Sequence, residues 1–493
     1  MSDVTFQHPE YVKNLPYWHK LDDVCEGEDA VKAKAEKYLP MPNAHDKSPA
    51  NKSAYEAYLT RAVFYEVTGT TSNSLVGAAF ATDPSFKFPP ELAHLERNAN
   101  GAGLSTYQLA QNGIRHLLKH YRCALYVDYP DVPPARNLAE FKAQKAYPMI
   151  HLLNALDVVN WDSVMIDNQK KLCLVVIREF KSERGADGFS KTEVEQYRVL
   201  RLEQEGNGEY IYSVQVYTKG EKGNWVGGDK KFPTDYNGNF WTYIPFTFVG
   251  AIDNSEEIKK PPLLPLANLN LAHYRDSADF QESVFYMGQP QYYAKGVNWE
   301  WYDQAKKRGI YIGAKVLLPL PENGGLGIVQ ADPNTLAREA MKDKWEKMKE
   351  MGARLIEKGS GSKKTATEAN SDDAVQHSVL SLCVVNMNEA LSAALRWAAK
   401  FVTPNVDVLT KDDLMFEISQ EFNKQGYLAE LARQLFEAAL QGRSSFKSWW
   451  EYNQTGMFPK QKYEEELQNV EAEQDGTLNQ KVERDGNRYQ KTI

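Results

Sequence analysis

The sequence has no hydrophobic run long enough to span a membrane, although 42% of its 493 residues are hydrophobic. A spanning helix needs about 18 or more consecutive apolar residues. Residues 1–8 have neither a basic head nor an apolar core, so no secretory signal is predicted. We therefore expect a protein made in the cytoplasm, with no membrane partner.

Cysteines are also few. The sequence has four, far apart and without the spacing of a metal site: Cys25, Cys123, Cys173 and Cys383. Thiols of cytoplasmic proteins are normally reduced. We expect these four to be free thiols.

An excess of basic residues is missing as well, because 58 Lys and Arg face 66 Asp and Glu, for a formal charge of −8. Sequence-independent binding of nucleic acid on an open surface needs clustered cations. The composition argues against that class of protein. It does not exclude a passage through which DNA slides without sticking.

Motifs of catalysis and of metal or cofactor binding fail on their context. Residues 185–192 end like a phosphate loop, but Ser190 stands where glycine is needed and a strand pattern follows. Residues 359–365 follow a helix pattern, whereas a phosphate loop follows a strand. His116 and His120 lie four apart on a predicted helix without a third ligand nearby. We predict no catalytic residue, no metal site and no cofactor, and hence no enzyme.

The first half of the chain changes from a helical period to a strand period. Helices are predicted over residues 8–40, over two segments joined by a turn near Gly69, and over residues 104–121. Residues 123–128 have strand composition. Between about 151 and 250, alternating patterns predict a largely antiparallel β region with strands at 172–180, 194–202, 210–217 and 240–248. The fold class is therefore α+β.

Two long helix patterns then bracket a short irregular segment. Residues 262–289 form the first, opened by a proline pair, and residues 333–358 form the second, opened by Asp332 and Pro333. Between them, residues 290–332 hold short β-like pieces at 291–294, 309–312, 315–318 and 327–330. The pattern predicts a small β-containing module inserted between two helices.

The polar segment at 359–372 has no residue large enough to anchor it in a core. Compact helix pairs usually need only two to eight connecting residues, so its length favours a role beyond chain connection. An idle surface loop is the alternative. An apolar helix is predicted over residues 373–404, followed by a helical region to about residue 465 and a polar, solvated tail.

This order of elements, with several local stretches, resembles the portal protein of tailed bacteriophages, in particular a portal-like family of phage and prophage genomes. The resemblance covers about residues 8–465, and its stretches have no known chemistry. They are His8-Pro-Glu-Tyr11, Gly27-Glu-Asp-Ala-Val31, Lys37-Tyr-Leu-Pro40, residues 55–65, Leu75-Val-Gly77, Leu269-Asn-Leu-Ala-His-Tyr274 and Ser277-Ala-Asp279.

The resemblance implies a portal fold with a helical stem, a small β-containing clip, a mixed α/β wing and a helical crown. The implied parts are the N-terminal helices and β region of the wing (1–261), the stem helices (262–289 and 333–358), the clip (290–332), the tunnel loop (359–372), the long wing helix (373–404), the crown (405–465) and a poorly ordered polar tail (466–493).

The implied function is a ring of identical subunits, commonly twelve, at one capsid vertex of the virion. Double-stranded DNA is packaged and ejected through the ring. The implied partners are the terminase large subunit, the major capsid and scaffolding proteins, and tail or head-to-tail adaptor proteins. Assembly takes place in the host cytoplasm.

Two sets of site residues follow from the resemblance. The tunnel loop would contact DNA through Lys363, Lys364, Ser360, Ser362 and Thr365, and the clip would dock partners through Trp299, Trp301, Lys306, Lys307 and Arg308. Two other readings remain open: a phage DNA-processing enzyme such as a nuclease or ATPase subunit, and a scaffold or adaptor protein without a channel.

Overall fold

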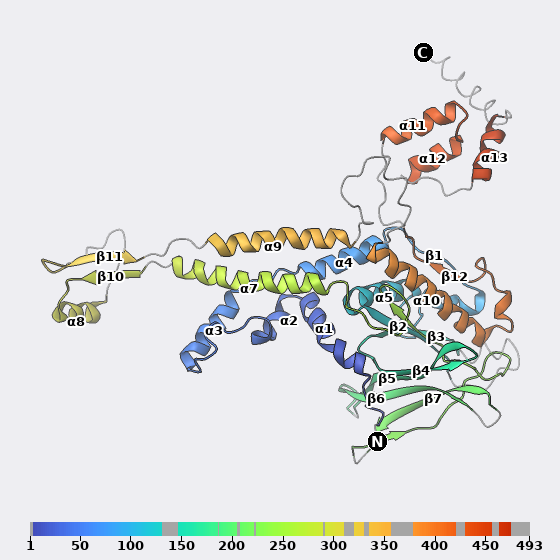
Figure 1. Ribbon diagram of the computed structural model, residues 1–493, viewed down its shortest axis with the longest axis horizontal. Coiled ribbons are helices and arrows are strands. Elements are labelled where there is room, and N and C mark those ends of the chain that lie inside the picture. The colour runs from blue at the N-terminus through green and yellow to red at the C-terminus, as the bar shows by residue number, and fades with distance from the viewer. Residues whose placement is uncertain are drawn as a thin grey trace. The chain divides into compact units, whose positions relative to one another are not determined.

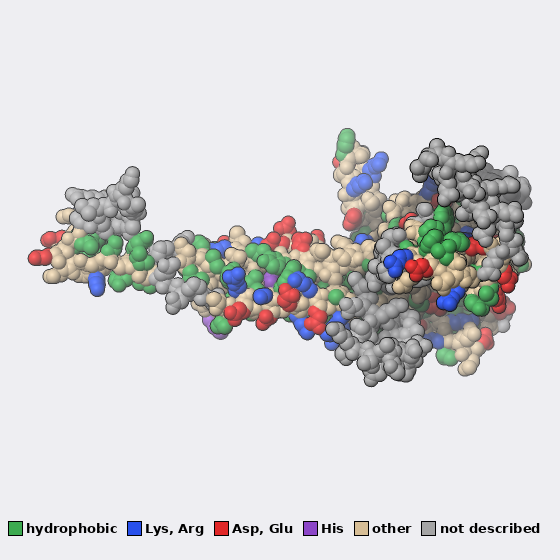
Figure 2. All heavy atoms as spheres, turned by 90° about the horizontal axis from the view of Figure 1, so that it is seen from above, with side chains coloured by type: hydrophobic (Ala, Val, Ile, Leu, Met, Phe, Trp, Pro, Cys, Tyr) green, Lys and Arg blue, Asp and Glu red, His purple; other side chains and the backbone are tan. Residues whose placement is uncertain are grey.

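The computed structural model describes residues 3–130, 146–185, 187–204, 208–220, 223–288, 291–309, 320–329, 335–355, 378–420, 429–455 and 463–474. Its fold is α+β, which confirms the predicted class (Figure 1). The chain divides into two compact units, one formed by residues 1–77 and 84–418, the other by residues 78–83 and 419–493. On the face shown in Figure 2, acidic and basic side chains are interspersed.

The core of the first unit is built around strand β2 (Arg122–Asp128). It lies between β3 (Met149–Asn154) and β9 (Phe246–Gly250) in an antiparallel sheet. Every residue of β2 except the last is buried, as expected for a strand covered on both faces. Side chains alternate between these faces, so Cys123 meets the helices while Tyr126 meets a second sheet.

Helices α5 (Thr106–His120) and α10 (Val379–Val402) pack against this sheet and against each other. Ser105 and Gln108 form a capping box that starts α5. The helix predicted from residue 373 begins at Val379 instead, because Ser378 is extended and its hydroxyl accepts the amide of Ser381 at 3.1 Å.

The second sheet is an antiparallel meander of β4 (Val158–Ile166), β5 (Gln169–Arg184), β6 (Lys191–Gln204), β7 (Tyr210–Lys219) and β8 (Trp225–Gly227). Three predicted strands are confirmed in β5, β6 and β7, whereas β3 and β4 were not predicted. The strand predicted at 240–248 begins only at Phe246 and belongs to the first sheet. The described residues between β5 and β6 belong to a hairpin, and Lys191 opens a strand, so the phosphate-loop reading of this segment is excluded.

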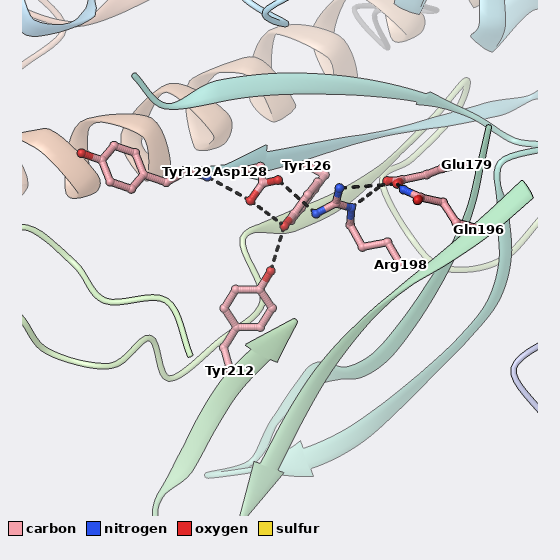
Figure 3. A network of polar contacts seen from close by, with 7 residues as sticks. All are labelled: Tyr126, Asp128, Tyr129, Glu179, Gln196, Arg198 and Tyr212. Atoms are coloured by element: carbon pink, nitrogen blue, oxygen red, sulfur yellow. Dashed lines mark hydrogen bonds and ion pairs between the residues drawn. The ribbon is translucent and has the colours of Figure 1, made fainter. Parts of the chain in front are cut away.

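A polar network joins the two sheets (Figure 3). The Arg198 guanidinium binds Glu179 through Nε at 2.7 Å and Asp128 through Nη1 at 3.1 Å. The Tyr126 hydroxyl lies 3.2 Å from Asp128 and 3.1 Å from the Tyr212 hydroxyl. Burial raises the pKa of both tyrosines, so they stay neutral donors. The network fixes the register of one sheet against the other.

The N-terminal region consists of α1 (Pro9–Glu26), α2 (Glu28–Ala33), α3 (Pro49–Arg61) and α4 (Val67–Ala79). The turn predicted at Gly69 is wrong, because the helices are separated by residues 62–66 and Gly69 lies inside α4. A Cβ on Gly69 would lie 2.7 Å from the carbonyl oxygen of Cys25. The glycine therefore serves close helix packing rather than a turn.

Short elements complete the first unit. Strand β1 (Ser85–Lys87) pairs with β12 (Met415–Glu417), and three 3-10 helices cover Ala35–Lys37, Pro90–Glu96 and Val406–Val408. Asp412 and Asp413 belong to a turn before β12. There the Asp413 carboxylate accepts the amide of Thr410 at 3.0 Å.

The second unit contains α11 (Ala429–Leu440), α12 (Phe446–Thr455) and α13 (Tyr463–Gln474). Of the poorly ordered polar tail predicted from residue 466, the part up to residue 474 belongs instead to α13, whose glutamates cap α12. Glu473 accepts the amides of Phe446 at 2.7 Å and Lys447 at 3.2 Å, and Glu466 accepts the amide of Ser445 at 2.8 Å. Residues 475–493 lie outside the described part of the chain.

Candidate functional site

The two long helices predicted on either side of the small module are present. Helix α7 (Leu264–Met287) and helix α9 (Thr335–Arg354) have 24 and 20 residues, or about 36 and 30 Å of length. They run antiparallel and side by side (Figure 1). The Lys344 ammonium of α9 pairs with the Asp276 carboxylate of α7, near the middle of both helices.

The first half of α7 is held by a buried polar face. Asn270 is fully buried, and its Oδ1 accepts from the amide of Thr68 at 3.2 Å and the hydroxyl at 2.9 Å. Its Nδ2 donates to the carbonyl of Tyr65 at 2.9 Å, and Ser277 accepts the amide of Val63 at 3.2 Å. Thr68 is the second residue of α4, so Asn270 caps α4 from another helix.

Two other acidic side chains of α7, Asp279 and Glu282, have partners on α3. Asp279 accepts the hydroxyl of Tyr58 at 2.6 Å. Arg61 donates from Nε to Glu282 at 3.0 Å, and its guanidinium lies 4.2 Å from the ring centroid of Phe285. Burial and the hydrogen bond to Asp279 raise the pKa of Tyr58. These contacts fix the direction in which α7 leaves the N-terminal helices.

Helix α9 contacts the same N-terminal segment through an aromatic group. Tyr65 lies edge-on to Trp345, with ring centroids 5.8 Å apart, and 4.7 Å from His273 of α7. Met348 alone is buried among the residues of α9, all of which the structure describes. Burial lowers the pKa of His273, so its ring is neutral at pH 7. One tyrosine thus contacts both long helices.

The distal half of the pair, residues 279–287 of α7 and 335–343 of α9, contains no buried residue. Leu336 is 76% exposed, Tyr286 62% and Val284 43%. Figure 2 shows hydrophobic side chains at the surface of the helix pair, among side chains of both charges. An apolar surface at this place is unusual for a chain without a partner.

The module between the helices consists of β10 (Gln291–Lys295), α8 (Trp299–Arg308) and β11 (Gly325–Val329). The strands pair antiparallel from Gln291 with Val329 to Lys295 with Gly325. The strands predicted at 291–294 and 327–330 are confirmed, whereas helix α8 was not predicted. The other two strands were predicted at 309–312 and 315–318. Apart from Gly309, which ends α8, their residues lie outside the described part of the chain.

Helix α8 carries the residues predicted to dock partners, but not on one face. Trp299 is 76% exposed, and its i+7 neighbour Lys306 is on the same face. Trp301 lies about 200° around the helix axis from Trp299. Tyr302, not predicted, stacks on Trp299 with ring centroids 5.1 Å apart. The i, i+3 spacing of two aromatic residues could have revealed it.

Of the other two predicted residues of α8, Lys307 and Arg308, the structure describes the side chain of Lys307 only. Lys307 is exposed and pairs with Asp303 at 2.8 Å, one turn earlier. Asn298 caps the helix by accepting the amide of Trp301 at 2.9 Å. The side chain of Arg308 lies outside what the structure describes.

The predicted DNA-contacting residues Lys363, Lys364, Ser360, Ser362 and Thr365 all lie outside the described residues. The two ends of the chain segment that holds them are described. The amide of Leu380, in the first turn of α10, donates to the carbonyl of Leu355, just after α9, at 3.4 Å. Residues 356–377 therefore leave and re-enter the described structure at one place.

The histidine pair on α5 contacts α1 rather than forming a metal site. His120 Nε2 lies 2.8 Å from the Asp22 carboxylate, which Lys119 also approaches at 2.7 Å. Burial raises the pKa of Asp22, but the hydrogen bond and charge of His120, with those of Lys119, lower it to about 2. Burial, with the charge of His120, lowers the pKa of His116 to about 3. Within the described ranges, no group of three His, Cys, Asp or Glu could hold a metal ion.

Comparison with known proteins adds a match over the region just described. Residues 262–402, from before α7 to the end of α10, match a family model described as a domain of unknown function, DUF4055. The match covers less than half of the chain. No curated protein matches the chain. Among the described helices, none is long and apolar enough to cross a membrane.

Similar chains among solved structures come from gene transfer agent (GTA) particles. One is described as the virion of a native particle (TM-score 0.39, 13% identity, covering 80% of this chain and 91% of that chain). Others are the neck of an empty particle with C6 symmetry (0.38, 12%, 80% and 90%) and the neck of a native particle with C12 symmetry (0.38, 12%, 80% and 91%). TM-scores below 0.5 do not show a shared fold, so nothing about this chain follows from them.

Proposed function

We propose that the chain is a portal protein of a tailed-phage-type virion, identical copies of which form a ring around a channel for double-stranded DNA. One observation carries the proposal: the paired helices α7 and α9 are connected by the small β10–α8–β11 module. The second helix then leads into a segment whose two ends meet at one place. The order is that of stem, clip, stem and tunnel loop. The role is structural, not enzymatic.

In a ring, each inward-facing side chain is repeated around the axis. Lys363 and Lys364 would form a belt of positive charge that contacts phosphates, with hydroxyls supplied by Ser360, Ser362 and Thr365. The net charge of −8 on each chain as a whole would keep the duplex from sticking elsewhere. DNA could then be guided without being held.

The exposed face of α8 is proposed as the docking surface for the terminase motor during packaging and for a tail or adaptor protein afterwards. Trp299, Tyr302 and Lys306 lie on this face. Exposed aromatic residues with an adjacent cation are typical anchors of protein interfaces. Trp301, on the opposite side of α8, is not part of this surface.

The ring itself is tested by native mass spectrometry and negative-stain microscopy of the purified full chain. A large ring with an axial hole supports the proposal. A monomer, or an oligomer without a hole, would refute it and favour a scaffold or adaptor protein. Nuclease or ATPase activity without a ring would favour the enzyme reading.

DNA contact is tested by Lys363→Ala with Lys364→Ala. Rings should form as before, while DNA packaging or retention changes because the positive belt is lost. Lys13→Ala with Lys52→Ala is the matched control, since both lysines are exposed and in the N-terminal helices. Loss of ring assembly in the loop variant would contradict the loop assignment.

Docking is tested by Trp299→Ala with Lys306→Ala in assembled rings. Binding of the motor or adaptor should weaken by about tenfold or more, as expected for loss of an aromatic anchor. Gln304→Ala, exposed but about 140° around α8 from Trp299, is the control. Equal binding by both variants would refute the assignment of this face.

A further inference from the structure

The charges of α9 are arranged differently in its two halves. In the half from Glu346 on, they pair within the helix: Lys349 lies 3.1 Å from Glu346, Lys347 lies 2.9 Å from Glu350, and Arg354 also pairs with Glu350. These are the i, i+3 and i, i+4 pairs that stabilise an isolated helix. This half of α9 needs no partner for its charges.

The first half has the opposite arrangement. Arg338 and Lys342 are four residues apart and form a cationic stripe, while Glu339 and Asp343 form an acidic stripe about 100° around the helix. All four side chains are exposed, and none is in an ion pair with any described residue. Like charges at i, i+4 destabilise a helix that stands alone.

The unpaired charges coincide with the apolar surface of the distal half. Leu336 of α9 is 76% exposed, and Val284, Phe285 and Tyr286 of α7 are between 39% and 62% exposed. The Lys344–Asp276 pair sets the antiparallel register, which brings Leu336 level with Val284. On α7, Glu282 and Phe285 contact Arg61 of α3. On α9, the four charges have no ion pair with a described residue, and Leu336, with Val284 and Tyr286 of α7, stays exposed beside them.

We infer that the distal half of the α7–α9 pair is the contact between neighbouring copies of this chain. The two stripes of α9 have opposite signs, so one copy can present its cationic stripe to the acidic stripe of the next. Such a contact joins two different sides of the same element, and repeated by rotation it closes into a ring. The acidic stripe makes nucleic acid an unsuitable occupant.

This inference rests on the proposed ring and names the residues that hold neighbouring copies together. Arg338→Glu with Lys342→Glu makes both stripes acidic, and Glu339→Lys with Asp343→Lys makes both basic. Each variant should raise the protein concentration needed for assembly by about tenfold or more, because attractive pairs become repulsive. Circular dichroism establishes that the helices remain.

Mixing the two variants gives the decisive measurement. An acidic copy and a basic copy attract each other on both sides, so the mixture should assemble into rings although neither variant does so alone. Lys347→Glu with Arg354→Glu is the control, because it makes the same change of net charge in the other half of α9. It should assemble like the unmodified chain.

The outcomes separate the two proposals. An unmodified chain that remains monomeric at every concentration would overturn both the ring and this contact. Unmodified rings whose assembly is unchanged in Arg338→Glu with Lys342→Glu would overturn this contact alone. Variants that fail to assemble and are not rescued by mixing would also overturn it, because complementary stripes would not be the cause.

Discussion

Replacing Asn270 by alanine should loosen α4 from α7, and the size of the effect follows from the hydrogen bonds. Asn270 accepts from the amide and hydroxyl of Thr68 and donates to Tyr65, in a site where neither Asn270 nor Thr68 is exposed. Alanine removes all three hydrogen bonds. It leaves the first turn of α4 without its cap.

Two contributions set the magnitude. Loss of a helix cap costs about 1 kcal/mol, and leaving the buried Thr68 groups unsatisfied costs about 1–3 kcal/mol more. The carbonyl of Tyr65 keeps a second partner, the amide of Val67 at 2.7 Å, so it adds little. A total of about 3 kcal/mol corresponds to roughly a hundredfold change in a local opening equilibrium.

Hydrogen exchange read by mass spectrometry measures this opening, because amides of α4 exchange when its first turn opens. Exchange in the first turn of α4 should be about a hundredfold faster in Asn270→Ala. Asn268→Ala is the control, since Asn268 is exposed and makes one bond, to Lys20 at 3.1 Å. If the two variants exchange within about threefold of each other, Asn270 is not the cap of α4.

Other predictions concern stability. Gly69→Ala should destabilise the chain by about 1–3 kcal/mol, because its Cβ would meet a main-chain carbonyl of α1, whereas Gly77→Ala in open space should stabilise by about 0.5–1 kcal/mol in thermal unfolding. The lowered pKa of Asp22 contributes stability above about pH 4 that is lost as pH falls through about 2; Asp22→Asn should therefore cost about 1–2 kcal/mol at pH 7 and nothing below pH 2 in urea titrations. If the unfolding free energy of Asp22→Asn depends on pH in the same way as that of the unmodified chain, the pair of Asp22 with His120 is excluded. Glu473→Ala should lower the unfolding temperature of the α11–α13 unit because two amides lose their acceptor, while alanine at the exposed Glu464 or Glu465 in the first turn of α13 should not.

The sequence predicts best those elements whose signals are local. Helix α5 has a capping box and a regular apolar stripe, and α7 has prolines at its start, so both were predicted within a few residues. Gly69 misled because glycine is usually a turn residue, and its packing against Cys25 involves a helix far away in the sequence. Long-range contacts of this kind leave no periodic pattern.

Helix α13 is a second case in which contacts between residues far apart in the sequence leave no local pattern. Its glutamates suggest a solvated tail, but Glu466 and Glu473 are seven residues apart and bind the start of α12. The docking residues on α8 were predicted from the resemblance, without a predicted helix to place them on. Assigning Trp299 and Trp301 to different faces requires knowing that they lie on a helix. The helix was not predicted because the neighbouring residues have strand patterns.

The contact between Leu355 and Leu380 has a consequence for how this chain can change over time. Both ends of the intervening segment are fixed at one place. The number of residues in it can therefore change with little effect on the helices on either side. Doubling the length of a closed loop costs only about 0.6 kcal/mol. Insertions or an engineered tag between these residues should therefore leave folding and the packing of α9 and α10 intact, so the length of this segment could change over time as long as the proposed DNA-contacting residues are kept.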